Sequence, residues 1–141
     1  MTSKEQLIIN NNTDKQIRAN ILLVEDSPSQ ALRFSQMLEN NGFCVHWSPN
    51  GNEGLRSVKQ QDFDLILLDV ELPDINGFDI CKQLKANPET ASTPVIMLTT
   101  RDKAKDVLVG LNNGAVDYIP KDDFAELVLL ETIRQMGLKS V

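Results

Sequence analysis

Five short, mostly apolar runs separated by stretches with helical periodicity constrain the fold of this chain more than any other feature of its sequence. Runs of four or five residues are too short for buried helices and have the length of strands. They lie at residues 21–24, 43–47, 65–68, 95–98 and 115–119. The pattern predicts five strands that alternate with five helices, a (βα)5 arrangement.

Start and stop signals locate the helices. Ser27 followed by Pro28 provides an N-cap and a proline at the first helical position, and the segment 40–42, Asn-Asn-Gly, ends this first helix. The other helices are predicted at about 51–60, 77–86, 103–112 and 123–137.

Crossovers from strand through helix to strand make the predicted sheet parallel. Strands two, three and four read as nearly continuous apolar runs, as expected where helices cover both faces of a sheet. We therefore predict an α/β fold in which a doubly wound, parallel five-stranded sheet forms a flavodoxin-like three-layer sandwich. The strand order common to small domains of this kind is 2-1-3-4-5, and ligands bind beyond the carboxyl ends of their strands.

The length of 141 residues allows one core of ordinary size. Residues 1–19 have only scattered apolar side chains and three consecutive asparagines, which predicts a flexible N-terminal leader. The folded domain is expected at 20–138. Few residues follow it, so no output domain is expected in this chain.

Composition excludes several classes of partner. A net charge of −6 repels nucleic acid on average. No apolar run approaches the ~18 residues of a membrane span, and the N-terminus is too polar for a signal peptide, so we expect a cytoplasmic protein that does not bind membranes. Cys44 and Cys81 form no CxxC pair and are expected to be buried free thiols. The classes of partner that composition and charge still allow are proteins, metal ions and small ligands.

Polar residues follow four of the five predicted strands. They are Glu25 and Asp26 after the first strand, Asp69 after the third, Thr99 after the fourth and Lys121 after the fifth. With strands one and three adjacent, three carboxylates converge at one edge of the sheet, which is costly unless a cation neutralises them. Oxygen ligands without a nearby histidine or cysteine suit Mg²⁺.

The charges of this predicted site allow a phosphoryl group to bind. Three carboxylates and Lys121 sum to −2, and one Mg²⁺ brings the site to zero. Transfer of a phosphoryl group to Asp69 would replace its charge with a dianion, and Lys121 and the Thr99 hydroxyl could hold the phosphoryl oxygens. The site is therefore predicted to form an aspartyl phosphate.

The strand-end residues together carry a family resemblance. They are Glu25 and Asp26, Asp69, the loop 72–77 with its Pro73 and Gly77, Thr99, and Lys121. Over about residues 20–138 the chain resembles the receiver domain of two-component response regulators, of the single-domain chemotaxis type. The resemblance implies a phosphorelay signalling protein and not an enzyme, with Asp69 as phosphoacceptor, Mg²⁺-dependent self-phosphorylation from small donors and slow self-dephosphorylation.

The resemblance also implies roles for the other residues. Asp26 and Asp69 would bind Mg²⁺ directly, Glu25 would help through water, and the backbone carbonyl of Glu71 would complete the protein ligands. Thr99 and Lys121 would bind the phosphoryl group. Tyr118 would be the aromatic switch whose ring turns inward when Thr99 moves.

Two departures from the usual pattern and two variable positions bear on how closely the family pattern applies. Receivers usually have proline after the lysine, whereas here Lys121 is followed by Asp122 and preceded by proline. A small residue commonly follows the switch threonine, and here it is Thr100. Glu71 and Arg101 occupy the two variable positions that tune receiver kinetics, and they are expected to pair across the entrance of the site.

The fifth predicted helix has apolar residues around most of its circumference, so part of it should be exposed. They are Phe124, Leu127, Val128, Leu129, Leu130, Ile133 and Met136. Two interpretations stay open, a short helix packed on two sides and a partner or homodimer surface. In receivers the fourth helix, fifth strand and fifth helix form the face that reports phosphorylation. The resemblance implies a histidine kinase or phosphotransfer protein upstream and an unidentified protein target downstream.

Two other functions are alternatives to the receiver. In an aspartate-nucleophile phosphatase, Asp69 and Glu71 would act as nucleophile and acid, but such enzymes generally need a cap or further loops. A receiver-like binding module that is never phosphorylated would usually have lost a site residue, and none of the main set is missing. Trp47 and His46 are expected to have structural roles, the first in packing and the second at a surface or edge position.

Overall fold

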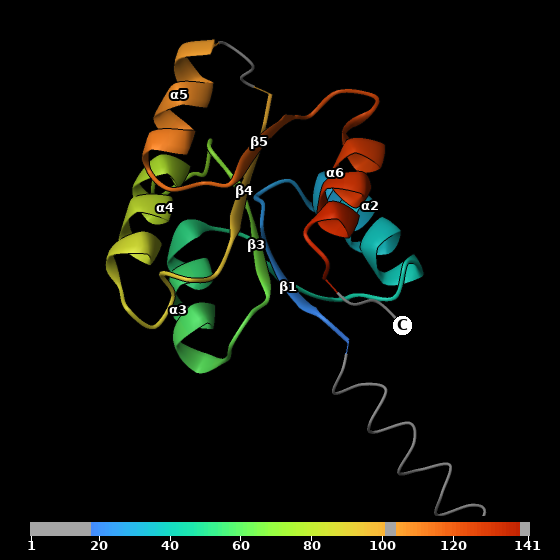
Figure 1. Cartoon of the computed structure of the whole chain (residues 1–141), viewed down its shortest axis with the longest axis horizontal. Coiled ribbons are helices and arrows are strands. Elements are labelled where there is room, and N and C mark those ends of the chain that lie inside the picture. Colours follow the sequence, from blue (N-terminus) through green and yellow to red (C-terminus); the bar gives the residue numbers. More distant parts are fainter. Residues whose placement is uncertain (1–17, 101–103, 139–141) are drawn as a thin grey trace, which may run out of the picture.

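The computed structural model describes residues 18–100 and 104–138 (Figure 1). In this part of the chain strands and helices alternate five times, as predicted. The elements are β1 (Asn20–Val24), α2 (Pro28–Asn40), β2 (Cys44–Ser48), α3 (Gly51–Gln60), β3 (Leu65–Asp69), α4 (Gly77–Ala86), β4 (Val95–Thr99), α5 (Ala104–Asn112), β5 (Asp117–Pro120) and α6 (Ala125–Gln135).

The five strands form one parallel sheet in the order β2-β1-β3-β4-β5, which confirms the predicted order. The chain thus passes from β1 outward to β2 and then returns past β1 to β3. The strand order reverses at this point, between β1 and β3, where ligands of doubly wound sheets bind.

Helices cover both faces of the sheet and make three layers. Figure 1 shows α2 and α6 together on one side and α3, α4 and α5 on the other. A separate hydrophobic core lies under each layer. Phe34 and Leu129 belong to the core under α2 and α6, and Phe78 and Leu84 belong to the core under α3, α4 and α5.

Side chains along each strand alternate between these two cores, as pleated strands require. In β3, Leu65 and Leu67 face the core of α2 and α6, whereas Ile66 and Leu68 face the opposite core. Asp69 continues the first series beyond the last leucine. The alternation along the strand therefore determines toward which face of the sheet the side chain at the strand end points.

Local signals fix the helix starts. The Ser27 Oγ accepts a hydrogen bond from the Gln30 N–H at 3.4 Å, and Pro28 opens α2. Asn50 and Asn76 cap α3 and α4 in the same way, through hydrogen bonds from Glu53 N and Phe78 N. Side chains that accept from the first free backbone N–H groups of a helix are the reason these helices begin where the sequence predicts.

One strand is less buried than predicted. β2 was expected to be covered on both faces, but His46 and Trp47 are exposed, and 41% of Trp47 is accessible. The reason is that β2 is the edge strand next to β1, so its apolar run does not mark a central position. The edge position expected for His46 is confirmed.

The last strand and helix are shorter than predicted. Residue 115 belongs to the turn that ends α5, because its N–H donates to the Gly110 carbonyl. α6 begins at Ala125 because the Asp122 carboxylate accepts the Phe124 N–H in a turn before the helix, and Gly137, at φ +78°, follows its end. The first residue predicted for α5, at position 103, lies outside the described residues.

Two further expectations concern the cysteines and the membrane. Both cysteines are free thiols; Cys81 is buried, which raises the pKa of its thiol, but Cys44 is only half-buried. Within residues 18–100 and 104–138, we find no helix with the length and apolar character needed to span a membrane.

Gly77 allows α4 to start directly against the backbone of β3. A methyl group on Gly77 would overlap the carbonyl oxygen of Asp69 and lie 2.8 Å from the Cα of Val70. The Gly77 N–H donates to the Val70 carbonyl at 2.8 Å. Because backbone atoms cannot move aside as a flexible side chain can, only glycine fits here.

We expect Gly77→Ala to lower the free energy of unfolding by about 2 kcal/mol or more, since the methyl group forces the backbone of Asp69 away. Urea unfolding measures this loss. Gln83→Ala, an exposed change in the same helix, is the control and should change stability by less than about 0.5 kcal/mol. Equal stabilities of the two variants would contradict the close packing described here.

Candidate functional site

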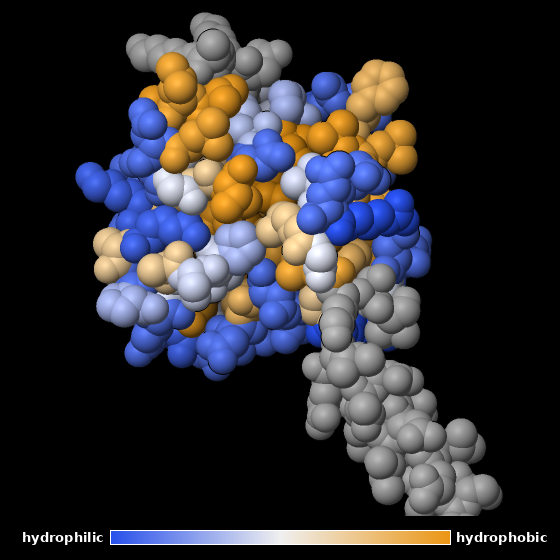
Figure 2. All heavy atoms as spheres, viewed as in Figure 1, coloured by the Kyte–Doolittle hydropathy of each residue, from blue (hydrophilic) through white to orange (hydrophobic). Residues whose placement is uncertain are grey.

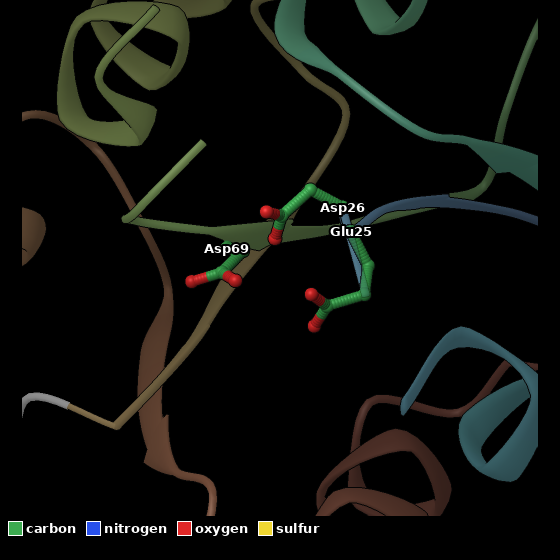
Figure 3. Close-up of side chains that lie close together, drawn as sticks. All are labelled: Glu25, Asp26 and Asp69. Carbon is green, nitrogen blue, oxygen red and sulfur yellow. The ribbon is translucent and has the colours of Figure 1, made fainter. Parts of the chain in front are cut away.

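Three carboxylates meet beyond the ends of β1 and β3. Glu25, Asp26 and Asp69 lie close together (Figure 3), and each offers an oxygen within 4.8 Å of the others. The sheet explains the meeting, because Val24 of β1 pairs with Leu68 of β3, which sets the following residues side by side. The convergence predicted from the sequence is therefore present.

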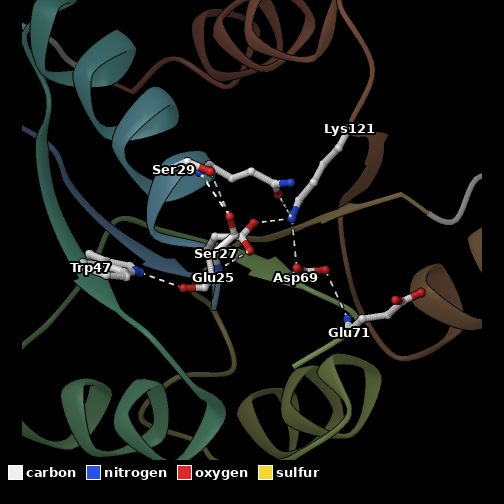
Figure 4. Close-up of polar contacts among 8 residues, drawn as sticks. Glu25, Ser27, Ser29, Trp47, Asp69, Glu71 and Lys121 are labelled. Atoms are coloured by element: carbon white, nitrogen blue, oxygen red, sulfur yellow. Dashed lines mark hydrogen bonds and ion pairs between the residues drawn. The ribbon is translucent and has the colours of Figure 1, made fainter. Parts of the chain in front are cut away.

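Lys121 joins two of these carboxylates. Its Nζ donates to Glu25 Oε1, to Asp69 Oδ2 at 2.9 Å and to Gln30 Oε1 at 2.7 Å (Figure 4). The Lys121 side chain is only 7% exposed, and Glu25 and Asp69 are buried as well, whereas Asp26 is exposed. A buried ammonium between buried carboxylates forms a charged contact largely shielded from water.

Glu25 is the carboxylate most affected by its surroundings. Burial raises its pKa, the Lys121 ammonium lowers it through hydrogen bonding and charge, and the negative charge of Asp69 raises it again, so that the pKa stays above the ordinary value. The Ser27 N–H also donates to Glu25 Oε2, at 3.1 Å. Further positive charge near this cluster would stabilise the ionised form.

Backbone contacts hold the carboxylates in place. The Trp47 Nε1–H donates to the Glu25 carbonyl at 2.7 Å, and Asp69 Oδ1 accepts the Glu71 N–H at 3.1 Å (Figure 4). The first bond fixes the turn after β1 and the second fixes the acid at the end of β3. The backbone of Glu25 and the carboxylate of Asp69 are therefore held in defined positions.

The site opens to solvent through a pocket of about 200 Å³. It is lined by Glu25, Asp26, Ser27, Gln30, Asp69, Glu71, Thr100 and Lys121. The three clustered carboxylates of Glu25, Asp26 and Asp69 exceed the Lys121 ammonium by two negative charges, and the exposed Glu71 carboxylate adds to the negative charge of the lining. All these acidic groups are hard oxygen donors. This donor set, which includes no histidine or cysteine, suits a hydrated Mg²⁺ ion.

The other predicted residues lie close to these. Thr99 is fully buried at the end of β4, and its carbonyl accepts the Lys121 N–H at 2.7 Å. Tyr118 is buried in the core under α3, α4 and α5. Thr100 is exposed at the pocket, as is Glu71. Arg101 lies outside the described residues, so its expected pairing with Glu71 stays a prediction.

Lys121 lies between Pro120 and Asp122, and its side chain reaches the site. Pro120 ends β5, and every peptide bond in the described parts of the chain is trans, the bond from Lys121 to Asp122 included. The ammonium nevertheless reaches both Glu25 and Asp69.

Two residues of the site were not identified from the sequence. Gln30 lies in the first turn of α2, and its contact with Lys121 joins positions 91 residues apart. Trp47 was assigned to packing, yet its indole nitrogen serves the carbonyl of a site residue. An indole at the end of an edge strand was the available signal for Trp47. The position of Gln30, three residues after an N-cap, favours a local capping role and gave no signal for the site.

Asp74 ties the loop after Asp69 to the start of α3. Its carboxylate accepts the N–H groups of Gly51 and Asn52, both at 2.8 Å, and that of Ile75 at 2.9 Å. Burial raises the pKa of Asp74 slightly, but the backbone N–H donors outweigh it and leave the pKa below its usual value. The loop that follows the candidate acceptor is thus anchored to a neighbouring helix.

Comparison with known proteins agrees with this geometry. The model of the response regulator receiver domain family matches residues 21–134, which contain the whole site. The chain therefore belongs to the response regulator receiver domain family of two-component systems.

Relatives differ in how much of their length is matched. PilH of Pseudomonas aeruginosa is 39% identical over 115 residues, which cover 82% of this chain and 94% of PilH. The crystal structure of the chemotaxis response regulator CheY4 of Vibrio cholerae has 30% identity and a TM-score of 0.78, covering 84% of this chain and 98% of CheY4. These likenesses support a single-domain, chemotaxis-type receiver.

Other relatives are longer. The DNA-binding response regulator MtrA of Mycolicibacterium smegmatis is 38% identical over 105 residues, which are 74% of this chain but only 45% of MtrA. The chain spans about half the length of such relatives, so the match concerns their receiver portion.

The Asp74 tether predicts a pH-dependent contribution to stability. Because its pKa is lower in the folded than in the unfolded chain, the stabilisation is complete above about pH 4 and is lost as the pH falls through the folded-state pKa. We expect Asp74→Ala to cost about 1 kcal/mol at pH 7, as for loss of a helix cap, and less at pH 3.

Urea unfolding of both proteins at the two pH values measures the difference. Glu89→Ala, an exposed carboxylate in the turn after α4, is the control for general charge effects. A cost for Asp74→Ala that stays constant or grows on acidification would contradict the prediction.

Proposed function

We propose that Asp69 accepts a phosphoryl group from a histidine kinase or histidine phosphotransfer protein, and that the chain signals through contacts with other proteins. The observation that carries this proposal is the position of Asp69, whose carboxylate lies at an open pocket in contact with Lys121 and beside two further carboxylates. A nucleophile, a cation to receive the transferred charge and a metal-binding donor set are the components that phosphoryl transfer requires.

The family resemblance implies the metal ligands, and the cluster of Glu25, Asp26 and Asp69 supports them. Asp26 and Asp69 would bind Mg²⁺ directly, Glu25 would contribute through water, and the Glu71 carbonyl would supply a further oxygen. The bound ion would supply the two positive charges that the site otherwise lacks.

In the transfer step an Asp69 carboxylate oxygen attacks phosphorus while the bond from phosphorus to the donor's imidazole nitrogen breaks. The electron pair of that bond stays with the nitrogen, so the donor leaves as neutral imidazole when its other ring nitrogen carries a proton, and otherwise leaves as imidazolate and takes a proton from solvent. The phosphoryl group brings two negative charges where Asp69 had one. Lys121 and the Thr99 hydroxyl hold its oxygens, since Thr99 ends β4, which pairs with β3, and Lys121, which follows β5, already contacts Asp69 Oδ2.

Phosphorylation reaches the surface through Thr99 and Tyr118. The two lie on adjacent strands, where Met97 pairs with Tyr118 and Thr99 with Pro120. Movement of Thr99 toward the phosphoryl group changes the space available to the Tyr118 ring. A ligand that prefers one of two arrangements shifts the population toward it, which is the physical basis of the switch.

The face next to this switch carries exposed hydrophobic side chains, visible over α5 and the start of α6 in Figure 2. They are Leu108, Val109, Leu111, Val116, Phe124, Leu127 and Val128. This α5–β5–α6 surface consists of the fourth helix, fifth strand and fifth helix of the fold. We assign the downstream target, or a second copy of the chain, to this surface because apolar patches of this kind favour protein contact.

The proposed domain extends over residues 20–138, with 1–19 as a leader, and acts in the cytoplasm. The family match over 21–134 supports these bounds. Like other receivers, the domain acts as a switch whose only catalytic activities are self-phosphorylation from small donors and slow self-dephosphorylation.

Acetyl phosphate with Mg²⁺ should add one phosphoryl group to the protein, and Asp69→Asn should abolish the addition because the amide lacks the nucleophilic oxygen. Mass spectrometry of the intact protein measures it. Asp62→Asn, an exposed change at the opposite edge of the sheet, is the control and should leave the addition intact. A stable single addition to the Asp69→Asn variant would overturn the assignment, and repeated turnover of a phosphate ester would favour a phosphatase.

Mg²⁺ binding should change the fluorescence of Trp47, the only tryptophan, because its indole N–H contacts the Glu25 carbonyl. We expect Asp26→Ala to weaken Mg²⁺ binding at least about tenfold and to slow phosphorylation, whereas Asp62→Ala should change neither. A fluorescence titration and the acetyl phosphate reaction measure the two effects. Equal phosphorylation rates in EDTA and in Mg²⁺ would exclude the metal role.

A further inference from the structure

Gln30 connects α2 to the candidate phosphoryl site. It lines the same pocket as Asp69, and its side-chain oxygen accepts a hydrogen bond from Lys121 Nζ at 2.7 Å. An ammonium group only donates, so the amide oxygen and not the amide nitrogen must face Lys121. The contact is therefore directional and chemically unambiguous.

With this bond, each of the three N–H groups of the Lys121 ammonium has its own acceptor, in Glu25, Asp69 and Gln30. The lysine stem is long and flexible, and a buried ammonium N–H without an acceptor is costly. Gln30 is the neutral member of the three. It fixes the ammonium without adding a negative charge that would oppose an incoming phosphoryl group.

The side chain of Gln30 does not have the local role that its position favours. Three residues after a serine N-cap, glutamine typically accepts the backbone N–H of the cap residue. Here the Ser27 N–H donates to Glu25 Oε2, and the Gln30 side chain extends to Lys121. The Ser27 hydroxyl caps the helix by accepting the backbone N–H of Gln30, without help from the Gln30 side-chain amide.

We propose that Gln30 is a positioning residue for Lys121 and that it sets the rate at which Asp69 is phosphorylated. The proposal rests on the function proposed above. When the charge of Asp69 passes to the phosphoryl group, the N–H that served Asp69 Oδ2 turns to a phosphoryl oxygen. Glu25 and Gln30 keep the other two N–H groups and hold Nζ in place during the transfer.

The test compares Gln30→Met, which keeps the length of the side chain but removes the acceptor, with the wild-type protein. In wild type the ¹⁵N-detected ammonium signal of Lys121 should exchange slowly with water, because all three N–H groups are bonded in a side chain that is 7% exposed. In Gln30→Met we expect faster exchange and acetyl phosphate phosphorylation slowed about three- to tenfold, as for loss of one hydrogen bond. Mg²⁺ affinity, read from Trp47 fluorescence, should change by less than about twofold.

Two further variants complete the design. Ser29→Ala changes an exposed neighbour in the same helical turn and should match wild type in every measurement. Gln30→Glu keeps an acceptor oxygen at the same position, so the slowly exchanging ammonium signal should persist. Its loss in both Gln30 variants would overturn the positioning role, because exchange would not depend on an acceptor at position 30.

The remaining outcomes separate the two proposals. If the wild-type protein is phosphorylated and Gln30→Met is phosphorylated at the same rate, the inference about Gln30 is wrong and the proposed function stands. Mg²⁺ affinity reduced as much as the phosphorylation rate would overturn it too, because the loss would then come from the metal ligands. Absence of phosphorylation in wild type would overturn the proposed function itself, whereas the ammonium signal would still test the contact.

Discussion

The ion pairs of Lys121 with Glu25 and Asp69 are the interaction on which the site depends. Two buried carboxylates beside each other are unfavourable, and the ammonium offsets both at once. Removing one partner from such a buried cluster typically costs about 3–5 kcal/mol, because the remaining charges stay desolvated. The pairs also connect the residues at the ends of β1, β3 and β5, so ion pairs as well as backbone hydrogen bonds hold these strands together at the carboxyl edge of the sheet.

The cluster of Glu25, Asp26, Asp69 and Lys121 carries an excess of negative charge that a cation could neutralise. Lys121 compensates one of three negative charges, and the pocket leaves Asp26 open to solvent. Membership of the receiver family and the likeness to PilH and CheY4 agree with a site of this composition. Trp47, Ser27 and the tether at Asp74 hold the surrounding backbone, so the charged groups are ordered before any ligand arrives.

Most of the fold and the main site residues could be predicted from the sequence, because both follow from short-range rules. Strand period and helix caps place the elements, and the parallel sheet brings Glu25, Asp69 and Lys121 to one edge. Gln30 could not be found this way, because its partner depends on the rotation of α2 against the sheet. The prediction that β2 is covered on both faces was wrong for a related reason. An apolar run gives the composition of a strand but not the number of elements that pack against it.

The alternation of side chains along the strands divides the site between the two helical layers. Asp69 continues the series of Leu65 and Leu67, and Lys121 contacts Gln30 of α2, so the charged contact belongs to the layer of α2 and α6. Thr99 continues the series of Val95 and Met97 and belongs with Tyr118 to the opposite layer. In the proposed function the phosphoryl group on Asp69 is a partner that both layers share, through Lys121 on one side of the sheet and the Thr99 hydroxyl on the other. Substitutions at Lys121 and Thr99 are therefore expected to have non-additive effects, as for residues of one network.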